Sequence, residues 1–115
     1  FTNCVGGYNS FGGLNLASGT FIDCTAFDDA FGGGGTASGT FTRCESTGNG
    51  CFGGFGTASG VFNNCIGGQE SFGGIFGVLT GQAYYCRLIT GTFQTVSGAG
   101  RTVLCIDGNN NQNNQ

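Results

Sequence analysis

The chain has 115 residues, of which 26 are glycine, 12 are phenylalanine, seven are cysteine and none is proline. One domain is expected for this length. Its net charge of -3, with three Lys and Arg residues in total, argues against nucleic-acid binding, which depends on clustered basic side chains. No apolar run approaches the roughly 20 residues of a membrane-spanning helix, so a membrane partner is not expected either.

A unit of about twenty residues repeats from the first residue onward, and a fixed period of this size is typical of stacked repeat architectures. Residues 1–20 read FTNCVGGYNSFGGLNLASGT, and residues 21–40 read FIDCTAFDDAFGGGGTASGT. We predict four regular coils over 1–82, degenerate capping coils over 83–108 and an Asn/Gln-rich tail or linker over 109–115. The chain lacks methionine and begins directly on the F-x-x-C signature, as an excerpt of a longer polypeptide would.

Three columns of residues recur at the repeat spacing and are predicted to fill the core. Two are phenylalanine columns, and the third is a cysteine column. The first contains Phe1, Phe21, Phe41 and Phe62 and continues as Ala83 and Thr102; the second contains Phe11, Phe31, Phe52, Phe72 and Phe93; the third contains Cys4, Cys24, Cys44, Cys65, Cys86 and Cys105. Such regularity indicates structural periodicity rather than compositional bias.

These units favour strands over helices. Glycine interrupts each unit every few residues, and each glycine costs a helix interior about 1 kcal/mol relative to alanine. Helical arrays also need longer units than this one. We therefore predict an all-β fold, a parallel β-solenoid of about five coils, in which each coil pairs with the next at a spacing of about 4.8 Å.

Alternation within each unit predicts which side chains face inward. In the segment 37–42, a period of two puts Ala, Gly and Phe on one face and Ser and Thr on the other. The Phe and Cys of F-x-x-C have opposite parity, so both can face inward only if the chain bends between them. Residues Asn3, Asp23, Arg43 and Asn64 precede the cysteines, and Asn and Asp tolerate the left-handed backbone that a one-residue corner requires.

The motifs F-T-N-C, F-I-D-C and F-N-N-C resemble the repeats of right-handed parallel β-helices of the pectate-lyase-like type. The glycine-rich tandem form is similar to repeats of predicted bacteriophage tail-fibre and appendage proteins. This resemblance covers roughly the first four units and implies the fold and a role in an appendage. The polysaccharide-cleaving members of such families use Arg, Lys and clustered carboxylates, which have no counterpart here, so no catalytic residue carries over.

The remaining candidate sites have structural interpretations that we favour. Stacked cysteines project in parallel, which does not suit the torsion that a disulfide requires. Zinc binding is not expected, because the chain has no His and no CxxC motif. Cys51, outside the column, is expected to be the exposed thiol. Asp28 and Asp29 are expected in a turn, with calcium binding as a lesser alternative. Further acidic candidates are Glu45 and Glu70. The repeated Gly-Gly pairs are expected to supply tight bends.

A row of hydroxyl side chains is predicted on the outer face of the solenoid. Its members are Ser18, Thr20, Ser38, Thr40, Thr42 and Ser59. The β-propensity of threonine already accounts for them as an ordinary solvated sheet face. Binding of ice or of a glycan through this face is the alternative.

Taken together, these patterns predict a structural, non-enzymatic segment of a virion or extracellular appendage, acting as a rigid spacer or adhesion fibre. Catalysis is not expected because the chain has few titratable groups. No cofactor or metal is expected. The predicted partners are further copies of the chain, with a homotrimer as one form, other appendage proteins or a surface glycan.

Overall fold

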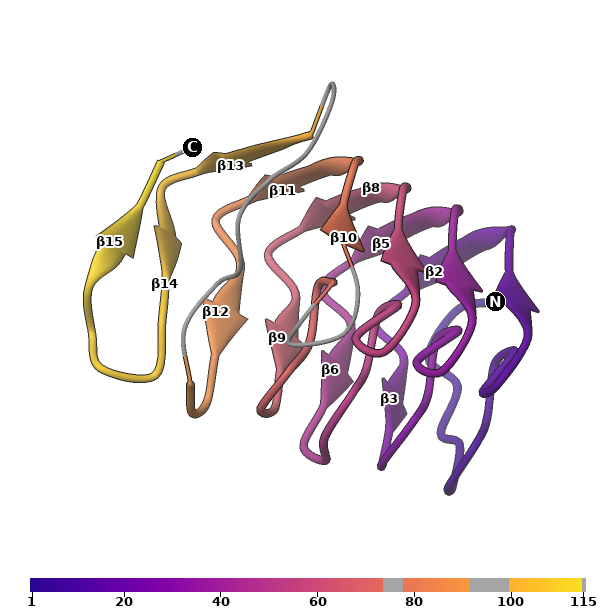
Figure 1. The fold of residues 1–115 in the computed structure, drawn as a ribbon. Helices are drawn as coiled ribbons and strands as arrows, with labels where there is room; N and C mark the ends of the chain where they lie inside the picture. Colours follow the sequence, from indigo (N-terminus) through magenta and orange to yellow (C-terminus); the bar gives the residue numbers. More distant parts are fainter. Residues whose placement is uncertain (74–77, 92–99, 115) are drawn as a thin grey trace.

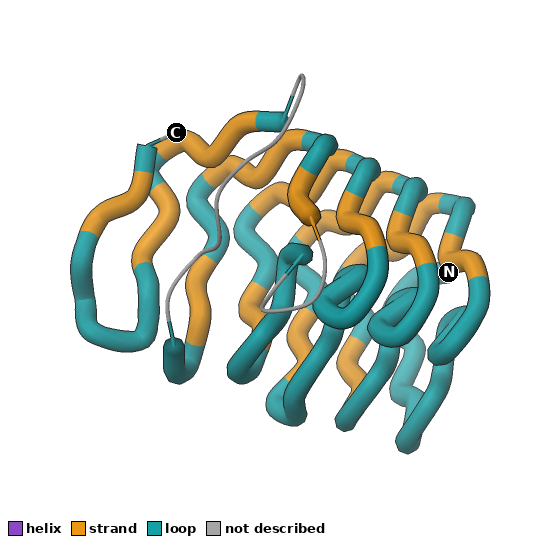
Figure 2. The backbone as a smooth tube through the Cα atoms, in the orientation of Figure 1, coloured by secondary structure: helices purple, strands orange, loops and turns teal. Residues whose placement is uncertain are grey.

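The computed structural model describes residues 1–73, 78–91 and 100–114, and it forms a parallel β-solenoid of about four turns with a spacing of about 21 residues. Successive coils stack side by side along one axis (Figure 1). Short strands alternate with bends and turns, and no helix occurs in the described ranges (Figure 2). The predicted all-β solenoid is confirmed, with about four turns where about five coils were expected.

Three sheets form the walls of the solenoid. The first sheet contains β1 (Leu16–Ala17), β4 (Thr36–Ala37), β7 (Thr57–Ala58) and β10 (Val78–Leu79). The second sheet contains β2 (Thr20–Ile22), β5 (Thr40–Thr42), β8 (Val61–Asn63), β11 (Gln82–Tyr84) and β13 (Arg101–Val103). The third sheet contains β3 (Thr25–Ala26), β6 (Glu45–Ser46), β9 (Ile66–Gly67), β12 (Arg87–Leu88), β14 (Cys105–Ile106) and β15 (Gln112–Asn113).

Strand pairing between coils is parallel and keeps the columns of the sequence in register. Phe21 lies beside Phe41, and Phe41 beside Phe62, as cross-strand partners in the second sheet. The pairing of β14 with β15 is antiparallel. Each coil therefore satisfies its backbone hydrogen bonds mainly with the next coil, which binds the stack into one unit.

A left-handed corner separates the second sheet from the third in every coil. The residues at this corner have φ between 50° and 55°, and they are Asn3, Asp23, Arg43, Asn64, Tyr85 and Leu104. The corner turns the chain between the Phe and the Cys of F-x-x-C, so that both side chains reach the core, as in Phe41 and Cys44, which are at most 1% exposed. The predicted one-residue corner is confirmed.

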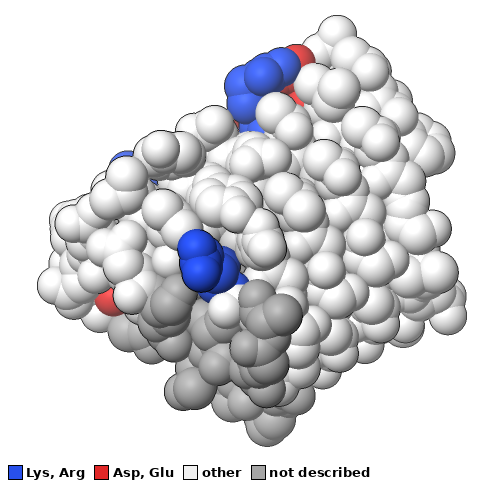
Figure 3. All heavy atoms as spheres, turned by 90° about the horizontal axis from the view of Figure 1, so that it is seen from above, with Lys and Arg blue, Asp and Glu red and all other residues white. Residues whose placement is uncertain are grey.

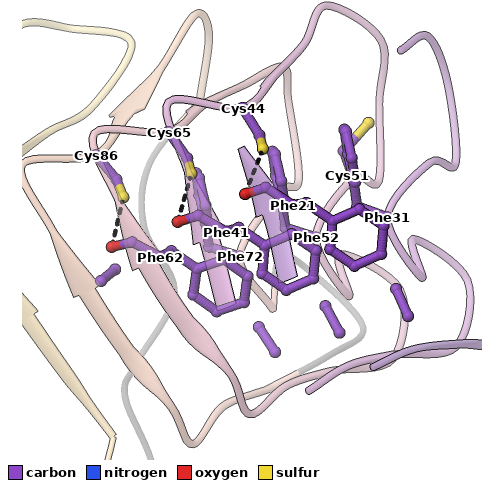
Figure 4. Close-up of a cluster of buried hydrophobic side chains, with 14 of the residues drawn as sticks. Phe21, Phe31, Phe41, Cys44, Cys51, Phe52, Phe62, Cys65, Phe72 and Cys86 are labelled. Carbon is purple, nitrogen blue, oxygen red and sulfur yellow. Dashed lines mark hydrogen bonds between the residues drawn. The ribbon is translucent and has the colours of Figure 1, made fainter. Parts of the chain in front are cut away.

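The two phenylalanine columns interlock at the centre of the core (Figure 4). Rings within a column are stacked, with centroids 4.8 to 5.1 Å apart and planes within 10° of parallel. Rings of different columns meet edge to face, at 5.4 to 5.9 Å and 67° to 82°. Both arrangements are favourable for aromatic pairs, each contributing about 0.5–1.5 kcal/mol beyond burial. Phe93, predicted to extend the second column, lies outside the described residues.

The second phenylalanine column lies in an unusual backbone conformation. Phe11, Phe31, Phe52 and Phe72 have φ between 51° and 55°, a region that bulky side chains rarely occupy. The glycine after each of them also has positive φ, for example 69° at Gly32. These pairs form the tight bend predicted for the Gly-Gly positions, and the bend points the ring into the core.

Phe1, predicted as a core residue, is the first residue of the described chain, and its ring continues the first phenylalanine column. Its ring stacks on Phe21 but is 69% exposed, because no coil lies over it among the described residues. Cys4 and Phe11 of the same coil are only partly buried.

The C-terminal end is covered by the segment predicted as a tail or linker. Here β15 folds back antiparallel to β14 (Figure 1). The buried hydroxyl of Thr102, at the end of the first phenylalanine column, donates to Asn113 Oδ1 at 2.5 Å. The Leu104 amide donates to Asn114 Oδ1 at 2.6 Å. Asparagine side chains thus satisfy polar groups at the end of the stack.

Candidate functional surface

The hydroxyl row predicted on the outer face divides between two places in the structure. Thr20, Thr40 and Thr42 lie on the outer side of the second sheet, in β2 and β5. Ser18, Ser38 and Ser59 are exposed but lie outside the strands, at the bend between the first and second sheets. Because a bend separates the serines from the threonines, the six hydroxyl groups do not share one flat surface.

The outer side of the second sheet changes composition from coil to coil. Its residues form two columns in register, of which one is Thr20, Thr40, Val61, Gln82 and Arg101 and the other is Ile22, Thr42, Asn63, Tyr84 and Val103. Hydroxyl groups repeat over only two neighbouring strands before apolar, amide and charged side chains replace them. The Tyr84 hydroxyl instead donates to Gln82 Oε1 on the same strand.

An ion pair lies at the left-handed corner beside this sheet. Arg43 donates from Nε and Nη2 to the two carboxylate oxygens of Asp23, at 2.6 and 2.8 Å. This hydrogen bonding lowers the pKa of Asp23 below its ordinary value and raises the pKa of Arg43. Viewed from above, this side of the molecule is mostly uncharged, with a second basic group beside the grey residues and few other charges (Figure 3). It therefore offers little electrostatic attraction to a charged ligand.

The acidic candidates lie at turns and strands rather than in one cluster. Asp28 and Asp29 lie in the turn predicted for them, and Asp28 Oδ1 accepts the amide of Asn49 from the next coil at 2.6 Å. Glu45 lies on β6, and Glu70 lies in a later turn with φ of 61°. Over the part of the chain that the structure describes, no three His, Cys, Asp or Glu residues are grouped to hold a metal ion.

All seven cysteines are free thiols, and the six of the predicted column repeat the same geometry. Within it, each buried thiol donates to a backbone carbonyl of the preceding coil, as from Cys65 Sγ to Phe41 O and from Cys86 Sγ to Phe62 O, both at 3.3 Å (Figure 4). Burial raises the pKa of Cys86 well above its ordinary value, so its thiolate is disfavoured. A thiol held like that of Cys86 acts as a packing group.

Cys51 is fully buried, so the prediction that it is the exposed thiol is wrong. Its Sγ lies 2.5 Å from Ser46 Oγ and 3.3 Å from Phe27 O, and burial raises its pKa. It directly precedes Phe52, as Ala30 precedes Phe31, and so faces inward. A small residue precedes each phenylalanine of the second column, and this pattern in the sequence could have indicated that Cys51 faces inward. Cys4, only partly buried, is the most accessible thiol.

Two open hollows were not predicted from the sequence, and both lie near the N-terminal end. One, of about 230 Å³, is lined by residues of the first three coils, including Val5, Phe27 and Glu45. Beside it the exposed rings of Tyr8 and Phe27 stack at 5.8 Å. The other, of about 240 Å³, opens into the end of the core among Phe1, Phe11 and Phe21. Glu45 is the one acidic side chain among the residues that line the first hollow, and the second is lined mainly by apolar residues.

Comparisons with protein-family models, with curated proteins and with solved structures gave no match. Within the described residues, no helix has the length and apolar character needed to cross a membrane.

Proposed function

We propose that this chain is a rigid structural segment of an extracellular or virion appendage, such as a phage tail fibre. In this role it acts as a spacer or adhesion fibre and performs no catalysis. The observation that carries the proposal is the unbroken register of the core, in which backbone pairing and ring stacking repeat together from coil to coil. The resemblance of F-x-N-C repeats to appendage proteins favours the same role.

Stiffness follows from this construction. Bending the stack would have to separate coils, breaking backbone hydrogen bonds on one side, such as those from Thr40 to Gly19 O and from Val61 to Gly39 O, at 2.9 and 3.0 Å. It would also move rings that are held on both sides in the column, such as Phe41 between Phe21 and Phe62. A spacer needs this resistance and nothing specific from its outer side chains, which agrees with their variation between coils.

Localisation tests the proposal. An antibody raised against the purified chain should, in immunogold electron microscopy, label filaments or fibres that project from virions or cells of the source. Antibody preadsorbed with the chain is the control and should give no label. Label confined to the cell interior, with none on projecting structures, would rule out the appendage role.

Ice or glycan binding through the hydroxyl row is the second candidate, and the two threonine-bearing strands β2 and β5 are the observation in its favour. Ice binding needs a flat array that continues across coils, whereas here the row is interrupted by Val61 and Gln82. We expect no thermal hysteresis from the unmodified chain, and no measurable change when Thr40 is replaced by Tyr. Clear thermal hysteresis that Thr40→Tyr abolishes would reverse this ranking.

A further inference from the structure

The outer side of the third sheet is a lateral face of the solenoid, here called the third-sheet face. It runs along the stack through β3, β6, β9, β12 and β14 (Figure 1). Two exposed apolar side chains on it are Phe27 and Ile89, which are 51% and 44% exposed. Beside them runs a column in register from strand to strand, each member at least partly exposed: Thr25, Glu45, Ile66, Arg87 and Ile106. Exposed apolar residues gathered on one face indicate an interaction surface.

Two opposite charges lie symmetrically about the middle of this column. Glu45 is one strand before Ile66, and Arg87 is one strand after it. At the usual strand spacing the two are roughly 9.6 Å apart along the stack. No ion pair or side-chain hydrogen bond joins either of them to another described residue. Glu70 of the central coil lies beyond the strand, in the turn, where it accepts from Gln69 Nε2 at 3.5 Å. The face thus carries one unpaired charge of each sign.

A hollow and an exposed apolar side chain are placed in the same symmetric way. The hollow of about 230 Å³ is lined in part by Thr25 and Phe27. Thr25 is two strands before Ile66 in the column. Ile106 is two strands after Ile66 and is 39% exposed. The hollow and Ile106 therefore lie on opposite sides of Ile66, at equal steps along the stack.

Two copies of this face can meet about a two-fold axis that lies in the plane between them. An axis parallel to the solenoid keeps the coil order of both copies the same, so it would place Glu45 against Glu45 and Arg87 against Arg87. An axis along β9 through Ile66 reverses the coil order. It places Glu45 of each copy against Arg87 of the other, and the hollow beside Thr25 against Ile106. Charge complementarity therefore selects the antiparallel arrangement.

From these observations we propose that the third-sheet face binds the same face of a second copy of the chain, forming an antiparallel, side-by-side dimer with its two-fold axis at Ile66. Two reciprocal ion pairs between Glu45 and Arg87 flank an apolar centre, and Ile106 of each copy meets the hollow of the other. Facing sheets pack about 10 Å apart, a gap that Glu and Arg side chains span together.

The size of the face sets the strength of the dimer. The molecule measures 29 × 24 × 20 Å, so one lateral face is smaller than the roughly 800 Å² per partner of a standard interface. The dimer is therefore weak and reversible. This inference goes beyond the proposed appendage role and is independent of it, because it depends only on the side of the solenoid.

Sedimentation equilibrium of the 115-residue chain, from micromolar to millimolar concentration, tests the proposal. The unmodified chain is expected to approach twice the mass of one copy as concentration rises. Glu45→Arg opposes like charges in both contacts and should abolish the dimer, as should Arg87→Glu. Combining the two substitutions exchanges the charges and should restore it. Arg101→Glu is the matched control, because Arg101 is exposed on the second sheet, and it should leave the dimer intact.

Nuclear magnetic resonance of the unmodified chain gives a second readout that needs no variant. Amide shifts that change with concentration should map to the third sheet, including Thr25, Glu45 and Ile106, and not to Thr40 or Val61 of the second sheet. Circular dichroism verifies that each variant retains its β-structure. A monomer at every concentration, a trimer, shifts confined to other faces, or a charge-exchanged variant that stays monomeric would each overturn the proposal.

Discussion

Replacing Phe41 with alanine tests the assignment of the core most directly. Phe41 is fully buried and contacts four other rings: it stacks on Phe21 at 4.9 Å and Phe62 at 5.1 Å, and meets Phe31 and Phe52 edge to face. Truncating a buried phenylalanine costs about 3–5 kcal/mol. We expect the upper half of that range, because strand pairing holds the flanking rings at the coil spacing and prevents the cavity from closing.

Urea unfolding followed by circular dichroism measures this cost, with two controls. Thr40→Ala, on the outer side of the same strand, should cost well under about 1 kcal/mol. Phe1→Ala removes the same side chain from the same column in the first described coil, where its ring meets those of Phe11 and Phe21, and should cost about 1–2 kcal/mol. Equal costs for Phe41→Ala and Thr40→Ala would mean that the inner and outer faces are inverted.

Three further predictions concern the thiols, a corner and the ion pair. A thiol-reactive probe should find seven free thiols in the denatured chain without reductant, and in the native chain it should modify Cys4 first and Cys51 only on unfolding; early modification of Cys51 would contradict its burial. Tyr85→Asn should stabilise the chain by up to about 1 kcal/mol in urea unfolding, because Tyr85 has φ of 55° with a 58% exposed side chain, and asparagine tolerates that backbone better. The pKa of Asp23 is lowered in the folded chain by its hydrogen bonds from Arg43, so the pair stabilises above the ordinary Asp pKa and this contribution is lost as pH falls through the lowered value. The stability difference between the unmodified chain and Asp23→Asn should therefore shrink on acidification, and a difference that grows in acid would refute the assignment.

The regular part of the fold could be predicted from the sequence because one coil constrains the next. Once Phe21, Phe41 and Phe62 are aligned in a column, parallel register and inward facing follow from the period. The corner at Asp23 and Asn64 could also be predicted, since residue type and parity both indicated a left-handed bend.

The irregular parts could not be predicted, because they depend on where the stack ends or on a single local bend. The exposure of Phe1 results from the absence of a neighbouring coil over it in the described chain, which no local motif encodes. The pairing of Asn113 with Thr102 depends on a chain reversal after Asp107, whose Oδ1 accepts the amides of Asn109 and Asn111. For the hydroxyl row, alternation indicated outward-facing side chains but not the bend that separates its serines from its threonines.

The different backbones beneath the two phenylalanine columns have a consequence for how the repeats diverge. Phe41 lies on a strand, where β-branched and small residues are acceptable, whereas Phe31 lies in a left-handed bend that β-branched residues strongly disfavour. Small and β-branched residues should therefore replace phenylalanine more readily in the first column than in the second. The chain agrees: the first column becomes Ala83 and then Thr102, while the second retains phenylalanine at all five of its positions in the sequence. Two columns that share one residue type thus lie on different backbones, and within this chain they differ in how far phenylalanine is retained.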